Sequence, residues 1–259
     1  MFPTNFSKSL SVRSSVKTAL VSSLMTLGIL APAQSLLAAS LEIGLVIDGS
    51  GSVSSSDFAL QRDAYVNIFS NDFVGNFLTG DVDTVYISFW QFASSVQEEV
   101  TWTTIQTNAD AIAFANAIAS VTQLGGGTNT AGAINTVANS ILTNAFDGDS
   151  EVIDLSSDGI PNDQAAAVTA ASNAFSNDIV TNTLFVGTGT TGQSNLAAIA
   201  AAGGGTPFVA NSFAEYEEAL TEKLDLEFNP GPTTPEPASI LGLLTLGSLG
   251  LTLKSKKKV

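Results

Sequence analysis

The stretch LEIGLVIDGSGS, residues 41–52, joins an apolar run to a turn that is rich in oxygen-bearing side chains. The apolar run predicts a buried strand, and the two glycines of the turn can adopt backbone angles that residues with a Cβ avoid. The side chains of Asp48, Ser50 and Ser52 can then converge on one point. A site of oxygen ligands alone suits Mg²⁺, tolerates Mn²⁺, and does not suit zinc or copper. The same composition is also common in ordinary turns.

The N-terminal segment has the three parts of a secretory signal peptide. Three basic residues precede an apolar stretch over residues 19–30, and small residues follow it. This order predicts a signal peptide over residues 1–39, with cleavage near residue 33 or residue 39. The alternative, an uncleaved anchor helix, needs about 20 apolar residues, which is more than this stretch contains. The domain that follows is therefore expected to be exported.

The C-terminal end also has three parts. A linker with Pro and Gly over residues 229–234 leads to the tripeptide Pro-Glu-Pro, an apolar run over residues 238–253 and a cluster of lysines. Residues 235–259 thereby resemble the PEP-CTERM sorting signal of exported bacterial proteins. The resemblance implies transient membrane anchoring, removal of the tail by an exosortase, and a final place at the surface or in the extracellular matrix of a Gram-negative-type bacterium that makes exopolysaccharide. The alternative is a plain tail anchor.

The region between the two signals, residues 40–228, is strongly acidic. Of the 24 acidic residues of the chain only Glu236 lies in the tail, and of the nine basic residues only Arg62 and Lys223 lie outside the two signals. The region thus carries 23 acidic against two basic residues, a formal charge of −21. Nucleic acid and anionic lipid surfaces both require a basic face, so neither is an expected partner. The membrane is reached only through the tail before processing.

The chain contains no His and no Cys. This composition excludes serine-histidine triads, thiol nucleophiles, imidazole acid-base catalysis and the usual zinc sites. A phosphate-binding loop with its lysine is also missing, and two basic residues are few for phosphoryl transfer. The domain is therefore not expected to be an enzyme, although a metal-assisted hydrolase with a carboxylate base remains as an alternative.

From residue 41 onward, short apolar runs alternate with helical patterns. The runs that predict strands span residues 41–47, 84–92, 151–155, 179–186 and 207–209, with an extra strand over 96–103. Helical spacing predicts helices from residue 56, over 108–119, from residue 131, and over 163–175, 194–202 and 213–224. This alternation predicts an α/β fold, a doubly wound, mainly parallel central sheet with helices on both faces. Such sheets bind ligands at the carboxyl ends of their strands.

Three separated segments are predicted to meet at that edge of the sheet. The run from Asp48 to Ser52 ends the first strand, Thr128 follows a glycine-rich loop, and Asp158 follows a later strand. The pattern Asp-x-Ser-x-Ser, then Thr, then Asp resembles the metal-ion-dependent adhesion site (MIDAS) of von Willebrand factor type A domains, and all five positions are present. The resemblance implies a domain of this type, Rossmann-like in architecture, over residues 40–228.

The resemblance also implies a role for each residue of the site. Ser50 and Ser52 would ligate the cation directly, Thr128 directly or through water, and Asp48 and Asp158 mostly through water. Mg²⁺ is the expected cation, with Mn²⁺ as a substitute and Ca²⁺ ranked below both. Neutral hydroxyl ligands leave the charge of the cation poorly compensated, so it keeps affinity for a carboxylate that a partner supplies.

These inferences predict an exported binding or adhesion module at the cell surface. Its expected partner is a carboxylate-bearing protein or an acidic polysaccharide, which would complete the shell of the cation. Two alternatives remain: a metal-assisted hydrolase, and a structural component of the extracellular matrix whose metal only stabilises the fold.

Two further predictions concern single residues. Asp154 interrupts an apolar strand, where an unpaired charge is costly, and we hypothesise a structural ion pair with Arg62. The alternative for Asp154 is a solvated position at the sheet edge. Integrin-type members of the resembling family use acidic residues for a second cation site where this chain has Ser55 and Ser56. That second site is therefore not expected, and the two serines are predicted to cap a helix.

Overall fold

A computed structural model describes residues 39–80 and 82–229 of the chain. The predicted signal peptide, apart from Ala39, and the predicted sorting tail lie outside the described residues, and so does the linker apart from Asn229. Within the described ranges, no helix combines the length and the apolar character that crossing a membrane requires.

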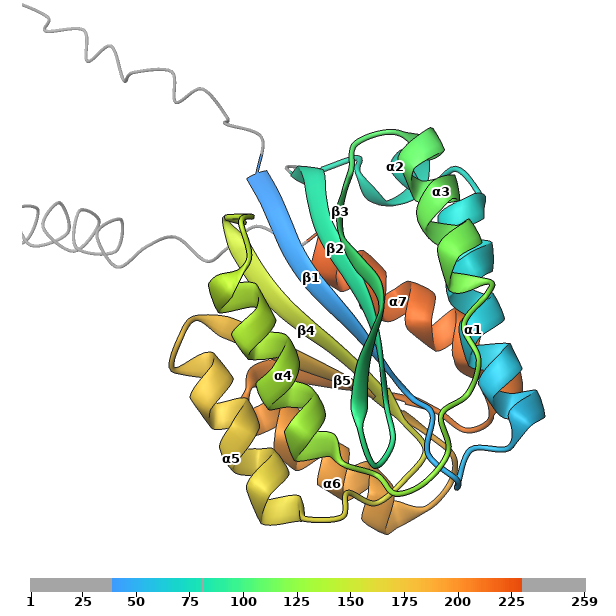
Figure 1. Cartoon of the computed structure of the whole chain (residues 1–259), viewed down its shortest axis with the longest axis vertical. Helices are drawn as coiled ribbons and strands as arrows, with labels where there is room; N and C mark the ends of the chain where they lie inside the picture. The colour runs from blue at the N-terminus through green and yellow to red at the C-terminus, as the bar shows by residue number, and fades with distance from the viewer. Residues whose placement is uncertain (1–38, 81, 230–259) are drawn as a thin grey trace, which may run out of the picture. The chain divides into compact units, whose positions relative to one another are not determined.

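A six-stranded sheet runs through the domain (Figure 1). Its strands are β1 (Ala39–Asp48), β2 (Val82–Phe92), β3 (Val96–Ile105), β4 (Ser150–Ser157), β5 (Ile179–Val186) and β6 (Gly204–Ala210). They lie in the order β3-β2-β1-β4-β5-β6, and all neighbours are parallel except β2 and β3, which are antiparallel. The chain therefore winds outward from β1 in one direction and then from β4 in the other. This arrangement confirms the predicted doubly wound, mainly parallel sheet.

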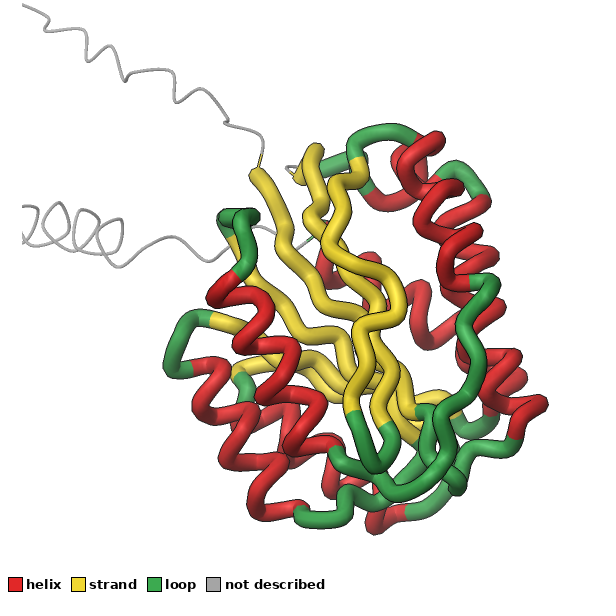
Figure 2. The backbone as a smooth tube through the Cα atoms, in the orientation of Figure 1, coloured by secondary structure: helices red, strands yellow, loops and turns green. Residues whose placement is uncertain are grey.

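Helices cover both faces of the sheet (Figure 1, Figure 2). One face is covered by α1 (Ser55–Ser70), α2 (Phe73–Phe77), α3 (Asn108–Ile118) and α7 (Tyr216–Phe228). The other face is covered by α4 (Thr130–Thr143), α5 (Gln164–Phe175) and α6 (Thr190–Ala202). Each group of helices shares its own buried apolar core with the sheet, so the sheet separates two cores.

The side chains of β1 pack into both cores. Alternate side chains enter the core beneath α1 and α7: Leu41, Ile43, Leu45 and Ile47. Val46 faces the other core, and at Gly44 a Cβ would lie 2.4 Å from Val137 Cγ1 of α4, so this position requires glycine. Burial of each such aliphatic side chain contributes roughly 1.5–3 kcal/mol. The strand that ends at Asp48 is therefore held firmly from both sides.

Several elements differ from their predicted bounds. β6 begins at Gly204 rather than at residue 207, α6 at Thr190 rather than 194, and a 3₁₀ turn (Phe213–Glu215) precedes α7. The short helix α2 is not among the predicted elements, because five residues give too little periodic signal. The N-cap of α1 is Ser54, whose hydroxyl accepts from the Asp57 N–H, so the predicted caps Ser55 and Ser56 are wrong.

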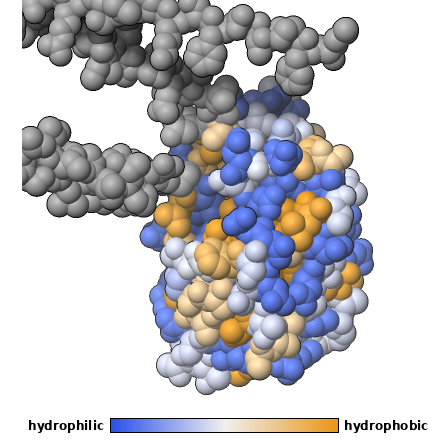
Figure 3. Space-filling model, turned by 90° about the vertical axis from the view of Figure 1, so that its left-hand side faces the viewer, coloured by the Kyte–Doolittle hydropathy of each residue, from blue (hydrophilic) through white to orange (hydrophobic). Residues whose placement is uncertain are grey.

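The side of the domain that lies at the left in Figure 1 carries mixed polar and apolar residues (Figure 3). Large exposed apolar side chains on α4 and α5 are Leu142 and Phe175. Single exposed apolar residues of this kind are normal on protein surfaces.

Candidate cation-binding site

The carboxyl ends of β1 and β4 place two predicted ligands close together. β1 lies between β2 and β4, with Ile47 beside Ser156 in register and Asp48 as the last residue of its strand. The turn after Asp48 and the loop after Ser157 therefore leave the sheet side by side. This is the point at which the winding of the sheet reverses, where open α/β sheets form their binding crevices.

A buried carboxylate forms the base of the site. Asp48 is 0% exposed, and its carboxylate accepts from the Ser50 N–H at 2.8 Å and from the Ser157 hydroxyl at 2.5 Å. Burial raises the pKa of Asp48 to about 6, although these hydrogen bonds act to lower it. No basic side chain of the described residues is among the groups that act on this carboxylate. Its negative charge is therefore stabilised by hydrogen bonds alone.

The two serines of the turn lie above this carboxylate and connect it to Asp158. The hydroxyl oxygens of Ser50 and Ser52 are 3.0 Å apart, and the Ser52 hydroxyl donates to Asp158 Oδ1 at 2.9 Å. Burial raises the pKa of Asp158, the bond from Ser52 lowers it, and the nearby charge of Asp57 raises it further. The site thus combines two carboxylates whose charges are both poorly compensated.

The glycine-rich loop is bonded directly to the turn after β1. Gly51 N–H donates to the Gly126 carbonyl and Gly125 N–H donates to the Gly49 carbonyl, both at 2.8 Å. Gly125 and Gly126 have φ angles of 74° and 108°, a region in which a side chain would be strained. The loop before Thr128 can adopt this conformation because Gly125 and Gly126 lack a Cβ, and the pairing of the two loops brings Thr128 to the site.

Thr128 is also bonded to the segment that follows Asp158. Its N–H donates to Asn162 Oδ1 at 3.1 Å, and its carbonyl accepts from the Asn162 N–H at 2.9 Å. A Cβ placed on Gly159 would lie 3.3 Å from Ser52 Oγ and 3.5 Å from Thr128 Oγ1. The hydroxyls of Ser52 and Thr128 therefore flank the same point, beside Asp158.

The structure accordingly places all five predicted ligands at one edge of the sheet: Asp48, Ser50, Ser52, Thr128 and Asp158. The donors are all oxygen, which fits Mg²⁺ or Mn²⁺. A serine hydroxyl can donate its hydrogen to a carboxylate and still offer a lone pair to a cation. No group of three or more His, Cys, Asp or Glu side chains in the described part of the chain could hold a metal, so a cation site here depends on the hydroxyls.

Four further residues, which the motif does not include, hold the site in shape. Ser157 bonds Asp48, and Asn162 bonds Thr128 as described above. Gln61 donates to the Asp48 carbonyl at 3.2 Å, and Gln123 donates to the carbonyls of Ser50 and Val53 at 3.1 and 2.8 Å. Of these four, only Gln61 could have been found from the sequence, because it is a polar residue within the otherwise apolar inner stripe of α1.

A hollow of about 780 Å³ lies beside Asp158. It is bounded by the loop after β4, the turn between β5 and α6, and the loop after β6, and its lining includes Asp57, Ile160, Thr188 and Phe213. No basic residue lines it. A ligand that occupied this hollow would meet neutral and acidic side chains, Asp158 among them.

A family model described as "Protein of unknown function (DUF1194)" matches residues 38–231. The chain belongs to the DUF1194 family. The matched residues include the whole described sheet and all five predicted ligands. A comparison with curated proteins found no match for this DUF1194 chain.

Solved structures show which fold the DUF1194 domain shares. Proximal thread matrix protein 1 (PTMP1) from the mussel byssus is 20% identical with a TM-score of 0.55, over 73% of this chain and 46% of that one. The von Willebrand factor domain of the pili tip protein Mfa5 from Porphyromonas gingivalis is 12% identical with a TM-score of 0.56, over 76% and 99%. A von Willebrand factor type A protein from Catenulispora acidiphila is 16% identical with a TM-score of 0.54, over 74% and 43%.

At these identities the likeness concerns the fold alone, and the DUF1194 domain has the von Willebrand factor type A fold. The chain spans less than half the length of the mussel and Catenulispora chains. A further structure of PTMP1, 21% identical with a TM-score of 0.54 over 73% of this chain and 46% of that one, is described as having a zinc-occupied MIDAS motif. The fold thus holds a divalent cation in one relative.

The hypothesis of an ion pair between Arg62 and Asp154 is wrong for the DUF1194 domain. Asp154 is fully buried and pairs with Lys223 of α7, whereas the Arg62 guanidinium bonds Asp63 at 2.7 Å and the Val121 carbonyl at 3.3 Å. Asp154 points to the side of the sheet that α7 covers, and Arg62 lies outside the buried stripe of α1. The alternative of a solvated edge position for Asp154 is also wrong.

Proposed function

We propose that the DUF1194 domain is an exported binding module that engages a carboxylate-bearing partner through a divalent cation. The residues that would hold the cation are Asp48, Ser50, Ser52, Thr128 and Asp158. The observation that carries the proposal is the convergence of oxygens from Ser52, Thr128 and Asp158, which belong to three segments far apart in the sequence. An ordinary turn needs no hydroxyl or carboxylate groups from two other loops, so their presence here favours a binding site over a plain turn.

The electrostatics of the site favour a cation. Asp48 is buried without a basic partner among the described residues, and a positive ion beside it would offset the cost of that burial. Hydroxyl ligands carry no charge, so the ion would retain affinity for one more anionic oxygen. The small number of oxygens fits the six positions of Mg²⁺ or Mn²⁺ better than the six to eight ligands that Ca²⁺ takes.

The partner's carboxylate would approach from the hollow beside Asp158. Because no basic side chain lines that hollow, the cation would be the main positive charge that meets the incoming carboxylate. A protein with one exposed Asp or Glu fits this arrangement. An acidic polysaccharide is the second candidate, but its repeated charges would be repelled by a domain with a formal charge of −21, unless salt or divalent cations screen them.

Two other functions, metal-assisted hydrolysis and a structural matrix role, are the alternatives to binding. A metal-assisted hydrolase would use Asp48 or Asp158 to activate water, but no basic group of the described site residues is placed to stabilise a leaving group. A structural matrix role would need the cation only for stability. The relatives of this fold that are named for threads and pili, PTMP1 and Mfa5, favour adhesion or matrix functions over catalysis.

The proposed location rests on the two ends of the sequence. Residues 1–39 would direct export, and residues 235–259 would anchor the protein in the membrane until an exosortase removed them. The domain would then act at the cell surface or in the extracellular matrix. The names of PTMP1 and Mfa5, a byssal thread protein and a pili tip protein, agree with a location outside the cell.

Thermal melts of the purified protein with chelator, Mg²⁺, Mn²⁺ or Ca²⁺ test the cation site. At 100 times its Kd, Mg²⁺ should stabilise the wild type by about 2.7 kcal/mol. Asp48→Asn and Ser52→Ala should abolish that gain. Ser56→Ala, which removes an exposed hydroxyl of the neighbouring helix turn, is the matched control and should retain it. A wild type that no cation stabilises would refute the assignment of the site.

Binding and turnover measurements then separate the three functions. A binding module should retain carboxylate-bearing surface proteins or extracted exopolysaccharide in Mg²⁺, release them in chelator, and fail to bind after Asp48→Asn. Turnover that disappears in the same variant would support the hydrolase instead. Stabilisation by metal with neither activity would leave the structural role.

A further inference from the structure

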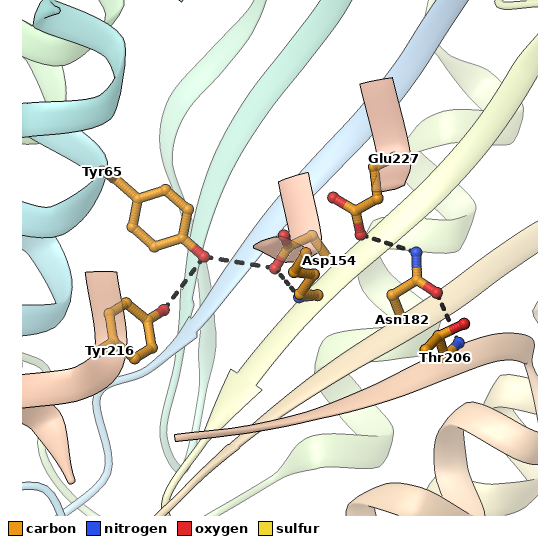
Figure 4. A network of polar contacts seen from close by, with 7 residues as sticks. Tyr65, Asp154, Asn182, Thr206, Tyr216 and Glu227 are labelled. Carbon is orange, nitrogen blue, oxygen red and sulfur yellow. Dashed lines mark hydrogen bonds and ion pairs between the residues drawn. The ribbon is translucent and has the colours of Figure 1, made fainter. Parts of the chain in front are cut away.

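A group of buried polar side chains lies between the sheet and α7 (Figure 4). Lys223 of α7 donates to Asp154 of β4, and both side chains are 0% exposed. The Tyr65 hydroxyl of α1 also donates to Asp154, at 3.4 Å, and the Tyr216 hydroxyl of α7 donates to that of Tyr65 at 3.3 Å. Nothing in the proposed binding function uses this group.

Glu227 belongs to the same group, one helical turn after Lys223. It is 6% exposed, and its Oε1 accepts from Asn182 Nδ2 of β5 at 2.8 Å. The Asn182 side-chain amide is fixed in this orientation and cannot flip, because its Oδ1 already accepts from the Thr206 N–H at 2.8 Å. The amide therefore satisfies one carboxyl oxygen of Glu227 and leaves the other, Oε2, for a different partner.

The charges of this group do not balance if every acid is ionised. One ammonium, that of Lys223, faces the two carboxyl groups of Asp154 and Glu227. Each carboxyl has one buried oxygen without a hydrogen-bond donor, Asp154 Oδ2 and Glu227 Oε2. The two carboxyl groups point toward each other (Figure 4), and Asp154 is among the groups that raise the pKa of Glu227. A single proton between them would give both oxygens a partner and remove the excess negative charge.

We infer that Glu227 is protonated and donates a hydrogen bond to Asp154, so that the last turn of α7 is fastened to β4 by a contact that depends on pH. Lys223 then pairs with an ionised Asp154, and the buried group is neutral. Release of the proton leaves two buried carboxylates against one ammonium. Repulsion between Asp154 and Glu227 then loosens the end of α7 from the sheet.

The other groups around Glu227 cannot replace this proton. α1 contributes the neutral phenol of Tyr65, α7 that of Tyr216, β5 the amide of Asn182 and β6 the backbone of Thr206. A cavity of about 430 Å³ adjoins Glu227, and the ionisable residues that line it are acidic: Asp149, Glu151 and Asp178. Two of these, Asp149 and Asp178, are exposed, so the cavity gives the Glu227 proton a route to solvent.

The direction of the pH effect follows from the position of the proton. Burial, aided by the charge of Asp154, raises the pKa of Glu227 well above its usual range, although Lys223 acts to lower it. The folded state keeps a proton that the unfolded chain loses above a pH of about 4.3. The stability that this proton contributes is complete below that pH and is lost as pH rises toward the folded-state pKa.

The variant Glu227→Gln tests the inference in the full chain. Its amide keeps the size of the side chain, accepts from Asn182 and donates to Asp154, but it has no proton to lose. Between pH 5 and 8, the folded-to-unfolded ratio of the wild type should fall relative to that of the variant, by up to about tenfold per pH unit. Glu222→Gln, on the exposed side of the same helix, should follow the wild type. Parallel pH profiles for the wild type and Glu227→Gln would overturn the inference.

A direct observation of the proton does not depend on how the variants fold. Infrared spectra at pH 7 should show a strong carbonyl band of a protonated carboxyl group in the wild type and in Glu222→Gln, and only the weak band of the minor protonated fraction of Asp48 in Glu227→Gln. As pH rises and the wild-type band disappears, amide hydrogen exchange should accelerate over residues 225–228. A wild type without the strong band at pH 7 would show Glu227 to be ionised and would refute the shared proton.

Discussion

Lys223 and Arg62 are the only two basic residues between the predicted end signals, yet the fold uses them in opposite ways. The Lys223 side chain is 0% exposed and lies on the inner stripe of α7, beside Leu220 and Leu224. The Arg62 side chain is 25% exposed and pairs with an adjacent residue of its own helix. Burial decides the energetic value of each pair, because a buried charge that loses its partner cannot be solvated.

Removing each basic side chain in turn should reveal this difference. Lys223→Met leaves Asp154 buried without a counter-charge and should reduce the free energy of unfolding by about 3–5 kcal/mol at pH 7. Arg62→Met removes a partly exposed pair with Asp63 and one hydrogen bond to the Val121 carbonyl, and should change it by about 0.5–2.5 kcal/mol. Urea unfolding of the two variants measures both values. A larger loss from Arg62→Met would contradict the pairing seen in the structure.

At the scale of single residues, the sequence predicts a site residue best when its side chain is a typical ligand and it also lies at the end of a predicted strand or loop. Asp48, Thr128 and Asp158 each follow a strand or a glycine-rich loop, so their meeting at the carboxyl edge follows from the fold class. The partner of Asp154 does not follow in this way, since Lys223 lies 69 residues away and its approach depends on how α7 packs. The available signal is the pair of charged residues, Lys223 and Glu227, on the mainly apolar inner stripe of α7.

At the scale of elements, prediction succeeds where apolar residues repeat regularly. β1 alternates between two cores, and α4 has apolar residues on one face, so both are recognisable from their sequences. β6 is an edge strand with a largely exposed burial pattern and two glycines, and α2 has only five residues. Neither has a period to detect, because tertiary contacts rather than local patterns define them.

Contact between β1 and α4 offers a test at this scale. A Cβ at Gly44 would lie 2.4 Å from Val137 Cγ1, so Gly44→Ala should reduce the free energy of unfolding by about 1–3 kcal/mol through overpacking. The loss should shrink when Gly44→Ala is made in a Val137→Ala background, because the clashing methyl group is gone. A double-mutant cycle by urea unfolding measures this coupling. Additive losses would show that α4 does not press on β1 at this point.

At the scale of the whole molecule, charge is the dominant property. The region over residues 40–228 has a formal charge of −21, and in the described structure its two basic side chains are both engaged with carboxylates. Any cation in solution therefore stabilises the domain to some degree by screening. A cation bound at the site of Asp48 and Ser52 acts in addition, because Asp48 and Ser50 are buried and Asp158 is half-buried, so salt screens their interaction with the cation less.

High salt separates these two effects. In 1 M NaCl the Debye length is about 3 Å, so general repulsion between surface carboxylates is largely screened before Mg²⁺ is added. Mg²⁺ should then still raise the melting temperature of the wild type, while that of Ser52→Ala should no longer respond. At low salt, Mg²⁺ should raise both, with the larger rise in the wild type. If 1 M NaCl removes the Mg²⁺ response of the wild type as well, divalent cations stabilise this domain by screening alone, and the oxygens around Asp48 do not bind them selectively.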